Sequence, residues 1–226
     1  MSKIIGNAVI TGGNRGIGLA LSQQLKACGY TVVVVHRKAE ELPELATAGL
    51  QQIPDIDVTQ PTGLRAALEA KGIQQIDLLI NNAGILLRDS LGQIDYDGLI
   101  KQFEVNSLGP LKVSEELLPL MQKGSKLIHI TSRMGSIEDN SSGGMYGYRM
   151  SKAALNAAAM SLAVDLKSHG IPVAVIHPGF VQTDMTGGRG LISTDESAIG
   201  ILKQIDRLEL DDTGTFWHMN GTILPW

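Results

Sequence analysis

The fold of this chain is decided by the stretch T-G-G-N-R-G-I-G at residues 11–18. An apolar run at residues 8–11 leads into it, and an amphipathic run at residues 17–28 follows it. Glycines between a strand and a helix permit a tight turn and let backbone amides approach a pyrophosphate at the helix N-terminus. The stretch therefore predicts a dinucleotide-binding turn. The alternative interpretation is an ordinary glycine-rich turn.

Short β-branched runs alternate with amphipathic stretches along the rest of the chain. Continuous apolar runs such as residues 31–35 are typical of parallel strands buried on both faces. The alternation predicts right-handed βαβ units and an α/β fold, with a doubly wound parallel sheet of about seven strands and helices on both faces. The expected strands are residues 8–11, 31–35, 51–56, 77–81, 126–131, 173–177 and 215–219. The expected helices are residues 17–28, 41–48, 62–71, 95–105, 106–122, 148–168 and 196–208.

Composition and charge exclude several classes of protein. A net charge of -4 argues against a general nucleic-acid binder, because such a protein needs a basic face. The single cysteine, Cys28, excludes an internal disulfide and a cysteine-based metal cluster, and we expect no metal site. Residues 1–13 lack the apolar core of a signal peptide, and no apolar run approaches the ~20 residues of a membrane span. Because a lone thiol also suits a reducing compartment, we expect a cytoplasmic protein without a membrane partner.

The end of the second expected strand bears on the choice of dinucleotide. An acidic residue there would bind both ribose hydroxyls and repel a 2′-phosphate. The sequence instead reads V-V-H-R-K at residues 34–38, and Arg37 can form a forked, charge-assisted pair with a phosphate. Arg15 in the glycine turn can reach the same place, so the two arginines favour NADP(H). Alternatively, Arg37 and Lys38 are solvated surface charges. His36 either lies near the phosphate pocket or only caps the strand.

Tyr148 and Lys152 are the leading catalytic candidates. They stand at positions i and i+4 of an expected helix, so the phenol and the ammonium share one face. A tyrosine titrates at about pH 10, and a nearby ammonium favours the phenolate, which suits proton exchange with a carbonyl or alcohol oxygen. Tyr146 has Met150 at i+4 and is not the candidate. The alternative is an amphipathic helix with an exposed lysine.

Together these motifs resemble the short-chain dehydrogenase/reductase family. The glycine turn, Asp57, N-N-A-G at 81–84, Asn106, Ser132, Y-x-x-x-K at 148–152 and P-G-x-V-x-T at 178–183 occur once each and in the family's order. The resemblance covers the whole chain. It implies a single-domain Rossmann fold over residues 1–226 and an NADP(H)-dependent oxidoreductase. The runs at 143–152 and 214–226 resemble the subgroup of sniffer-type carbonyl reductases and bacterial C-factor proteins.

The resemblance implies roles for the remaining polar residues. The backbone carbonyl of Asn106 would complete a proton relay, although asparagine is also a good helix N-cap. Ser132 would hydrogen-bond the substrate oxygen, with Thr131 as its rival and a loop-initiating serine as the alternative. Asp57 would accept from the adenine amino group, unless it is an N-cap or turn aspartate. Thr183 would bind the nicotinamide carboxamide.

The expected site follows from these assignments. The resemblance also places an apolar wall of Pro178 and Val181 behind the nicotinamide ring, whereas we assign no chemistry to His177. The expected catalytic residues are Asn106, Ser132, Tyr148 and Lys152. The expected cofactor-binding residues are Gly12, Asn14, Arg15, Gly16, Ile17, Gly18, His36, Arg37, Asp57, Val58, Asn82, Ala83, Gly84, Tyr148, Lys152, Pro178, Gly179, Val181 and Thr183.

Apolar residues in the expected loops indicate a hydrophobic aldehyde, ketone or dicarbonyl substrate, although each could equally belong to the core. They are Ile85, Leu86, Leu87, Met134, Ile137, Met145, Tyr146, Phe180 and Met185. We therefore expect an NADPH-dependent reductase in which Tyr148 donates the proton. The alternatives are an NADP(H)-binding signalling or regulatory protein of C-factor type, and an alcohol or dihydrodiol dehydrogenase working in the oxidative direction. The alanines of 153–159 would permit a homodimer or homotetramer, unless they pack on the sheet.

Overall fold

The computed structural model describes residues 6–226, and the first five residues, where the stretch inspected for a signal peptide begins, lie outside the described part. Seven parallel strands form one sheet in the order β3-β2-β1-β4-β5-β6-β7, which confirms the predicted doubly wound architecture. The strands are β1 (Asn7–Thr11), β2 (Thr31–Val35), β3 (Gln51–Ile53), β4 (Ile76–Asn81), β5 (Met121–Ile130), β6 (Val173–His177) and β7 (Thr215–His218).

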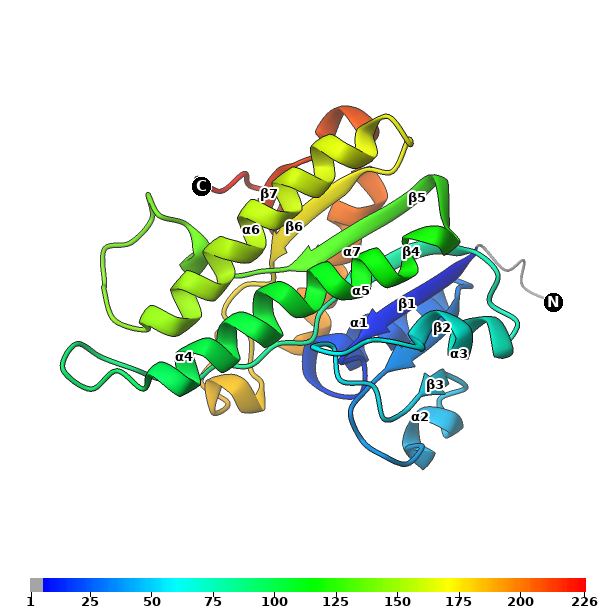
Figure 1. The fold of residues 1–226 in the computed structure, drawn as a ribbon, viewed down its shortest axis with the longest axis horizontal. Helices are drawn as coiled ribbons and strands as arrows, with labels where there is room; N and C mark the ends of the chain where they lie inside the picture. The colour runs from blue at the N-terminus through cyan, green and yellow to red at the C-terminus, as the bar shows by residue number, and fades with distance from the viewer. Residues whose placement is uncertain (1–5) are drawn as a thin grey trace.

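Helices cover both faces of the sheet, and the arrowheads of the strands point to one side, where the longest loops project (Figure 1). The carboxyl ends of all strands therefore gather at one edge, which is where open α/β sheets bind ligands. The helices are α1 (Gly16–Ala27), α2 (Pro43–Thr47), α3 (Leu64–Ala70), α4 (Tyr96–Phe103), α5 (Gly109–Leu117), α6 (Tyr146–Lys167) and α7 (Thr194–Arg207).

Two hydrophobic cores lie on opposite faces of the sheet, because alternate side chains of each strand point to opposite sides. Val9 and Leu79 belong to the core beneath α3, α5 and α6. Ile10 and Ile80 belong to the core beneath α1 and α7. All four side chains are fully buried, which explains why the strands read as continuous apolar runs in the sequence.

Prolines account for two differences from the predicted boundaries. The third strand ends at Ile53 and not at residue 56, because Pro54 has no N–H to continue the ladder. The helix expected to run to residue 122 ends at Leu117, where Pro119 shapes a short 3-10 turn (Leu118–Leu120), and β5 starts directly after it.

The helical region at residues 95–122 also differs from the prediction of two helices that meet at residue 106. A π-helical turn (Glu104–Leu108) instead joins α4 to α5 without a break. Asn106 lies in the middle of this turn and caps no helix. Pro110 has no N–H, so the carbonyl of Asn106 lacks the partner that an α-helix would provide four residues later.

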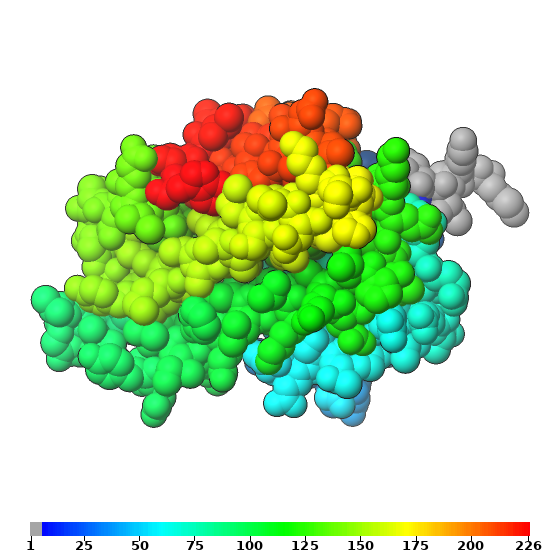
Figure 2. All heavy atoms as spheres, turned by 45° about the horizontal axis from the view of Figure 1, so that its top comes forward, coloured from blue at the N-terminus to red at the C-terminus, as the bar shows by residue number. Residues whose placement is uncertain are grey.

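No helix within residues 6–226 combines the length and the apolar character that crossing a bilayer requires. The longest helix, α6, has 22 residues and packs beside α4 on one face of the molecule (Figure 2).

The central position of β4 makes a stability prediction. Leu79→Ala removes a fully buried side chain from the middle of the sheet, and we expect it to lower the free energy of unfolding by about 2–5 kcal/mol. The matched control Leu191→Ala removes the same atoms from a side chain that is 83% exposed, and should cost less than about 0.5 kcal/mol. Urea denaturation followed by circular dichroism measures both. Equal losses in the two variants would contradict the assignment of this core.

Candidate active site

The glycine turn is tied to the end of β4 by a set of hydrogen bonds. The Thr11 hydroxyl accepts the backbone N–H groups of Asn82 and Ala83, each at 3.1 Å. The Asn82 side chain donates in return to the carbonyls of Thr11 and Gly12, each at 3.1 Å. These hydrogen bonds hold the carboxyl ends of β1 and β4 together, and Ala83 lies against Gly12.

Glycine is required at two positions of the glycine turn, residues 12 and 18. Gly12 has φ +65°, which disfavours any other residue. A Cβ at Gly18 would lie 2.3 Å from the Gly12 carbonyl oxygen and 2.5 Å from Asn82 Nδ2, so a side chain there would push α1 off the strand. These contacts explain the spacing of the glycines in the sequence.

The start of α1 fits an anionic group. Arg15 precedes the helix without capping it through its side chain, and the first turn contains no acidic residue. The N–H groups of Gly16, Ile17 and Gly18 therefore lack the side-chain partners that helix starts usually have, and they face outward with the positive end of the helix dipole. A cleft of about 350 Å³ opens beside Gly16 and Thr183. Asn14, next to Arg15 in this turn, is partly exposed.

The two arginines expected to bind a phosphate are exposed, and each has an acidic partner. Arg15 Nη1 lies 3.3 Å from Asp184 Oδ2, and Arg37 Nη1 lies 4.0 Å from Asp57 Oδ2. Exposed ion pairs of this kind contribute little free energy and exchange partners readily. Both arginines therefore remain suitable ligands for a 2′-phosphate.

Asp57 makes the local bonds of a turn aspartate. Its Oδ1 accepts both the N–H and the hydroxyl of Thr59 at 2.8 Å. Partial burial raises the pKa of Asp57, but these hydrogen bonds and the charge of Arg37 outweigh that effect, so the pKa lies below its usual value. The carboxylate stays ionised and keeps its second oxygen for another donor.

Two residues expected near the cofactor point their side chains inward. His36 is buried, and its Nε2 lies 3.2 Å from Gln52 Oε1. Val58 belongs to the core and contacts Gly109 at the start of α5. Their main chains still border the end of β2 and the segment after β3, so their contribution to a cofactor site would come from the backbone.

Tyr148 and Lys152 lie together on the buried side of α6. Lys152 Nζ donates to the carbonyl of Ile130 at 2.9 Å and lies 6.0 Å from the centroid of the Tyr148 ring. Burial lowers the pKa of Lys152 to about 8. Burial also raises the pKa of Tyr148 to about 12, against which a hydrogen bond with Ser132 lowers it. The tyrosine is therefore a protonated phenol at neutral pH, beside an ammonium.

Ser132 follows β5 at the same edge of the sheet. Its hydroxyl accepts the N–H of Met134 at 3.1 Å, while Thr131 donates to Asn156 Oδ1 at 2.7 Å in the interior. Only Ser132 therefore faces Tyr148.

His177, the residue to which no chemistry was assigned, packs edge-on against His218 with ring centroids 5.0 Å apart. Burial and the neighbouring His218 lower the pKa of His177 to about 3, so it stays uncharged.

Asn106 supports the site with its side chain. Its Oδ1 accepts the N–H of Ile85 at 2.8 Å, and its Nδ2 donates to the Ile85 carbonyl at 2.8 Å and to Ser151 at 3.0 Å. Gly84, Asn106 and Lys152 lie close together. A Cβ at Gly84 would lie 3.1 Å from Asn106 Oδ1 and 3.7 Å from Lys152 Nζ. The structure thus gathers all four expected catalytic residues where β4, β5 and α6 meet.

The segment after β6 returns to the glycine turn. Gly179 has φ +88°, and Val181 is buried with its carbonyl bonded to the Thr186 hydroxyl at 2.8 Å. The Thr183 side chain approaches Gly16, where a Cβ would lie 3.6 Å from Thr183 Cγ2. Pro178 is buried and accepts from Ser197 of α7 at 2.7 Å. The cleft beside Gly16 is lined by residues of α1, of the segment after Val181 and of the start of α7, namely Gly16, Leu19, Ala20, Gln23, Gln182, Thr183, Asp184, Thr194 and Asp195.

Sequence reasoning missed several residues that hold the site. Gln102 accepts the N–H of Leu87 at 2.9 Å, and Asp89 binds the first residues of α6. Neither Gln102 nor Asp89 belongs to a recognisable sequence motif. The available signal was that residues 143–145, before α6, contain no Ser, Thr, Asp or Asn to serve as an N-cap.

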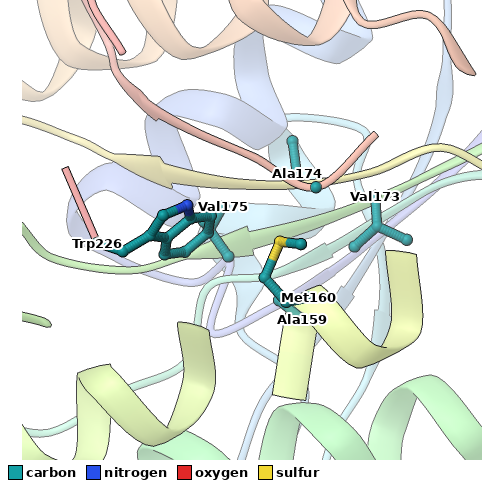
Figure 3. Close-up of a pocket in the computed structure, with 7 residues that line it drawn as sticks. Ala159, Met160, Val173, Ala174, Val175 and Trp226 are labelled. Atoms are coloured by element: carbon teal, nitrogen blue, oxygen red, sulfur yellow. The ribbon is translucent and has the colours of Figure 1, made fainter. Parts of the chain in front are cut away.

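An apolar recess lies between the later turns of α6 and strand β6, lined in part by Ala159, Val173 and Val175 (Figure 3). Trp226 closes it and packs on Phe216 with ring centroids 5.4 Å apart. The main-chain oxygen of Trp226 also accepts the N–H groups of Ile137 and Glu138 at 3.1 and 3.0 Å. The recess contains none of the expected site residues, so we interpret it as packing between α6 and the last strands.

Comparison with known proteins identifies the family. The sequence model of the short chain dehydrogenase family matches residues 6–191, which include the glycine turn and all four expected catalytic residues. The chain belongs to the short-chain dehydrogenase family. It is therefore an oxidoreductase with the family's nucleotide-binding fold, as the motifs predicted.

Relatives place this short-chain dehydrogenase near two kinds of protein. It is 38% identical to the 1-hydroxy-2-glutathionyl-2-methyl-3-butene dehydrogenase of Rhodococcus sp. (strain AD45), over 96% of this chain and 98% of the relative. It is 44% identical to the C-signal protein of Myxococcus xanthus, over 67% of this chain and 93% of that protein.

Solved structures agree with the subgroup that the sequence indicated. The carbonyl reductase Sniffer of D. melanogaster superposes with a TM-score of 0.90 at 31% identity, covering 97% of this chain and 99% of that one. The NADPH-bound carbonyl reductase from chicken fatty liver gives 0.89 at 30% identity, covering 99% and 100%.

The close contact at Gly18 predicts the effect of a single methyl group. Gly18→Ala places a Cβ against the Gly12 carbonyl and Asn82, and overpacking of this kind costs about 1–3 kcal/mol. We expect dinucleotide affinity to fall by about tenfold or more in a fluorescence titration. Gly63→Ala is the control: it strains a positive φ of +88° with no atom within 4 Å, so it should lower stability without changing affinity. Unchanged affinity in Gly18→Ala would contradict the assignment of the turn.

Proposed function

We propose that this short-chain dehydrogenase is an NADPH-dependent carbonyl reductase in which Tyr148 donates a proton to the carbonyl oxygen of a hydrophobic aldehyde, ketone or dicarbonyl. The observation that carries the proposal is the burial of Tyr148 and Lys152 together, with Ser132, at the carboxyl edge of the sheet. A structural helix has no need of a buried lysine beside a buried phenol, since burying an ammonium is costly.

NADP(H) fits the residues that are present. The free amides at the start of α1 suit the pyrophosphate, and Arg15 and Arg37 suit the 2′-phosphate because no acidic residue follows β2 directly. The cofactor, when bound, supplies the hydride. Thr183 and the backbone of 179–181 would hold its nicotinamide end against the catalytic residues. The NADPH-bound carbonyl reductase of similar structure supports this choice.

Each catalytic side chain has a distinct task in carbonyl reduction. Ser132 hydrogen-bonds the substrate oxygen and orients it toward Tyr148. Tyr148 donates its proton to that oxygen as negative charge develops there. General acid catalysis of this kind raises the rate by about 10²–10⁴-fold. Lys152 stabilises the resulting phenolate by its charge, and its own position is fixed by the Ile130 carbonyl. The backbone carbonyl of Asn106, to which Pro110 can donate no N–H, would hold a water that returns a proton to this pair.

An apolar substrate suits the surroundings of the site. Leu87 lies in the loop after β4, Phe180 and Met185 lie in the connection after β6, and their side chains are 40%, 49% and 41% exposed. Exposed apolar side chains of this size around a polar centre mark a ligand site more often than chance exposure does. The nine apolar residues singled out from the sequence remain our candidates for the substrate wall, although Ile137 at 82% exposure contributes least.

Two alternatives retain specific support. The resemblance to the C-signal protein supports an NADP(H)-binding regulator. The Rhodococcus relative, named as a dehydrogenase of a glutathionyl alcohol, supports oxidation of an alcohol. Reduction is favoured here because Arg15 and Arg37 suit NADP(H), and the protonated phenol of Tyr148 is the form that donates to a carbonyl oxygen.

We further propose that the protein forms a homodimer or homotetramer. Tyr96, Ile100 and Phe103 share one face of α4 and are 70%, 55% and 37% exposed, and Met150 on the adjoining α6 is 54% exposed. An apolar stripe over two neighbouring helices supports self-association through this face.

Loss of the phenolic hydroxyl tests the reaction. With NADPH and a panel of aromatic aldehydes, α-diketones and cyclic ketones, we expect Tyr148→Phe to lower kcat by about 10²–10⁴-fold. Tyr146→Phe is the matched control, because Tyr146 has no lysine at i+4 and should keep most of the activity. Absorbance of the reduced nicotinamide measures turnover. Retention of activity in Tyr148→Phe, or a preference for NADH, would contradict the mechanism or the cofactor assignment respectively.

The ionisation of Lys152 predicts the pH dependence. Burial lowers its pKa to about 8, so the ammonium is present below that pH and lost above it. Tyr148, with a pKa raised to about 12, stays protonated throughout. We therefore expect kcat for carbonyl reduction to be steady from pH 6 to about 7.5 and to fall as the pH rises through about 8. A rate that stays level to pH 10 would contradict this assignment.

A further inference from the structure

The helix that carries Tyr148 begins without a cap of its own. Met145, the residue before α6, has φ +55° and makes no side-chain hydrogen bond to the first turn. Two glycines at 143 and 144 precede it. The first N–H groups of an α-helix have no partner within the helix and need one from elsewhere when they are shielded from water. Tyr148 lies only two residues after the helix starts at Tyr146.

Asp89 supplies these partners from the loop after β4. Its Oδ1 accepts the N–H of Tyr146 at 2.5 Å, and its Oδ2 accepts the N–H of Gly147 at 2.8 Å. Its main-chain oxygen accepts the N–H of Met145 at 3.1 Å. Three consecutive amides of the chain thus bind one residue that lies 57 positions away from Tyr146. A carboxylate also matches the positive end of the helix dipole.

The loop that carries Asp89 is itself held at two further points. The Asn106 side chain bonds both the N–H and the carbonyl of Ile85, and buried Gln102 accepts the N–H of Leu87. Gly147 lets the pieces meet, because a Cβ there would lie 2.5 Å from Gln102 Nε2 and 3.2 Å from Asp89 Oδ2. Alternate residues 85, 87 and 89 are therefore each fastened to a helix.

We propose that Asp89 is a positioning residue for the reaction: it fixes the first turn of α6, and with it the Tyr148 phenol, at a set distance from the substrate wall formed by residues 85–87. The inference rests on the proposed carbonyl reduction. Asp89 does not touch the reacting atoms and acts through the helix. Catalysis is sensitive to this placement, because a shift of about 1 Å in a reacting group costs on the order of 100-fold in rate.

The rest of α6 does not depend on this contact. Leu155, Ala159 and Leu166 are buried against the sheet and hold the later turns of the helix. Loss of the Asp89 carboxylate therefore frees the first turn without unfolding the helix. The glycine turn, Arg37 and Thr183 belong to other loops and Lys152 lies in a later turn of α6, so most of the expected cofactor contacts do not depend on Asp89.

The test compares Asp89→Ala and Asp89→Asn with Asp95→Ala. Alanine removes both acceptor oxygens, whereas asparagine keeps one. Asp95→Ala is the matched control, because Asp95 caps α4 through Gly98 at 3.1 Å and so removes a carboxylate cap from a helix that carries no catalytic residue. For each variant, kcat and KM for a reducible carbonyl, the Kd for NADPH and the hydrogen–deuterium exchange of residues 145–149 are measured.

We expect kcat to fall by about 10–100-fold in Asp89→Ala and by less in Asp89→Asn, while the Kd for NADPH stays within about twofold. The amides of Tyr146 and Gly147 should exchange faster in both variants and remain unchanged in Asp95→Ala. A kcat within about twofold of wild type in Asp89→Ala, or an equal loss in Asp95→Ala, would overturn the proposal.

Failure of the proposed function gives a different result. If the wild-type protein reduces no carbonyl, the exchange measurement still tests the contact, and unchanged exchange at Tyr146 and Gly147 in Asp89→Ala overturns it independently. If Asp89→Ala does not fold, Asp89→Asn carries the comparison, because its remaining oxygen preserves one of the two side-chain bonds.

Discussion

The burial of the Lys152 ammonium is the constraint on which the site depends. An ammonium in the interior needs a partner, and the carbonyl of Ile130 at the end of β5 provides it at 2.9 Å. This bond fixes α6 against the sheet at the level where the strands end. Tyr148, one turn earlier on the same face, is thereby placed beside Ser132. Because burial disfavours the charged form, the pKa of Lys152 is lowered to about 8. The group therefore changes its charge at a pH only slightly above neutrality.

The remaining polar contacts surround this pair with fixed main chain. Asn106 holds Ile85, Thr11 holds Asn82 and Ala83, and Asp89 holds the start of α6. Each bond joins segments that are far apart in the sequence. The reacting groups therefore lie on a preorganised frame, in which little reorganisation is needed when charge develops on a substrate oxygen. The exposed apolar side chains of the loops after β4 and β6 leave the shape of the proposed substrate site open to variation.

The sequence predicted strands such as β2 and β6 well because each is a nearly continuous apolar run buried on both faces. It predicted that Tyr148 and Lys152 lie together, because they are four residues apart on one helix. It did not predict the π-helical turn around Asn106, which depends on tertiary bonds to Ile85 and Ser151. It also did not predict the role of Asp89, because a loop residue that acts across 57 positions leaves no periodic signal. The sequence likewise did not predict that the His36 side chain points inward toward Gln52, because this contact also leaves no periodic signal.

The central claim is that a buried Lys152 ammonium lies beside a protonated Tyr148 phenol and stabilises the phenolate that proton donation would leave. Lysine labelled with ¹³C at Cε, followed by NMR from pH 6 to about 11, measures its ionisation directly, and Lys152→Met assigns the signal. The account predicts that the Lys152 signal titrates near pH 8. A Lys152 signal that titrates at the ordinary value of a free lysine, about 10.4, would contradict it.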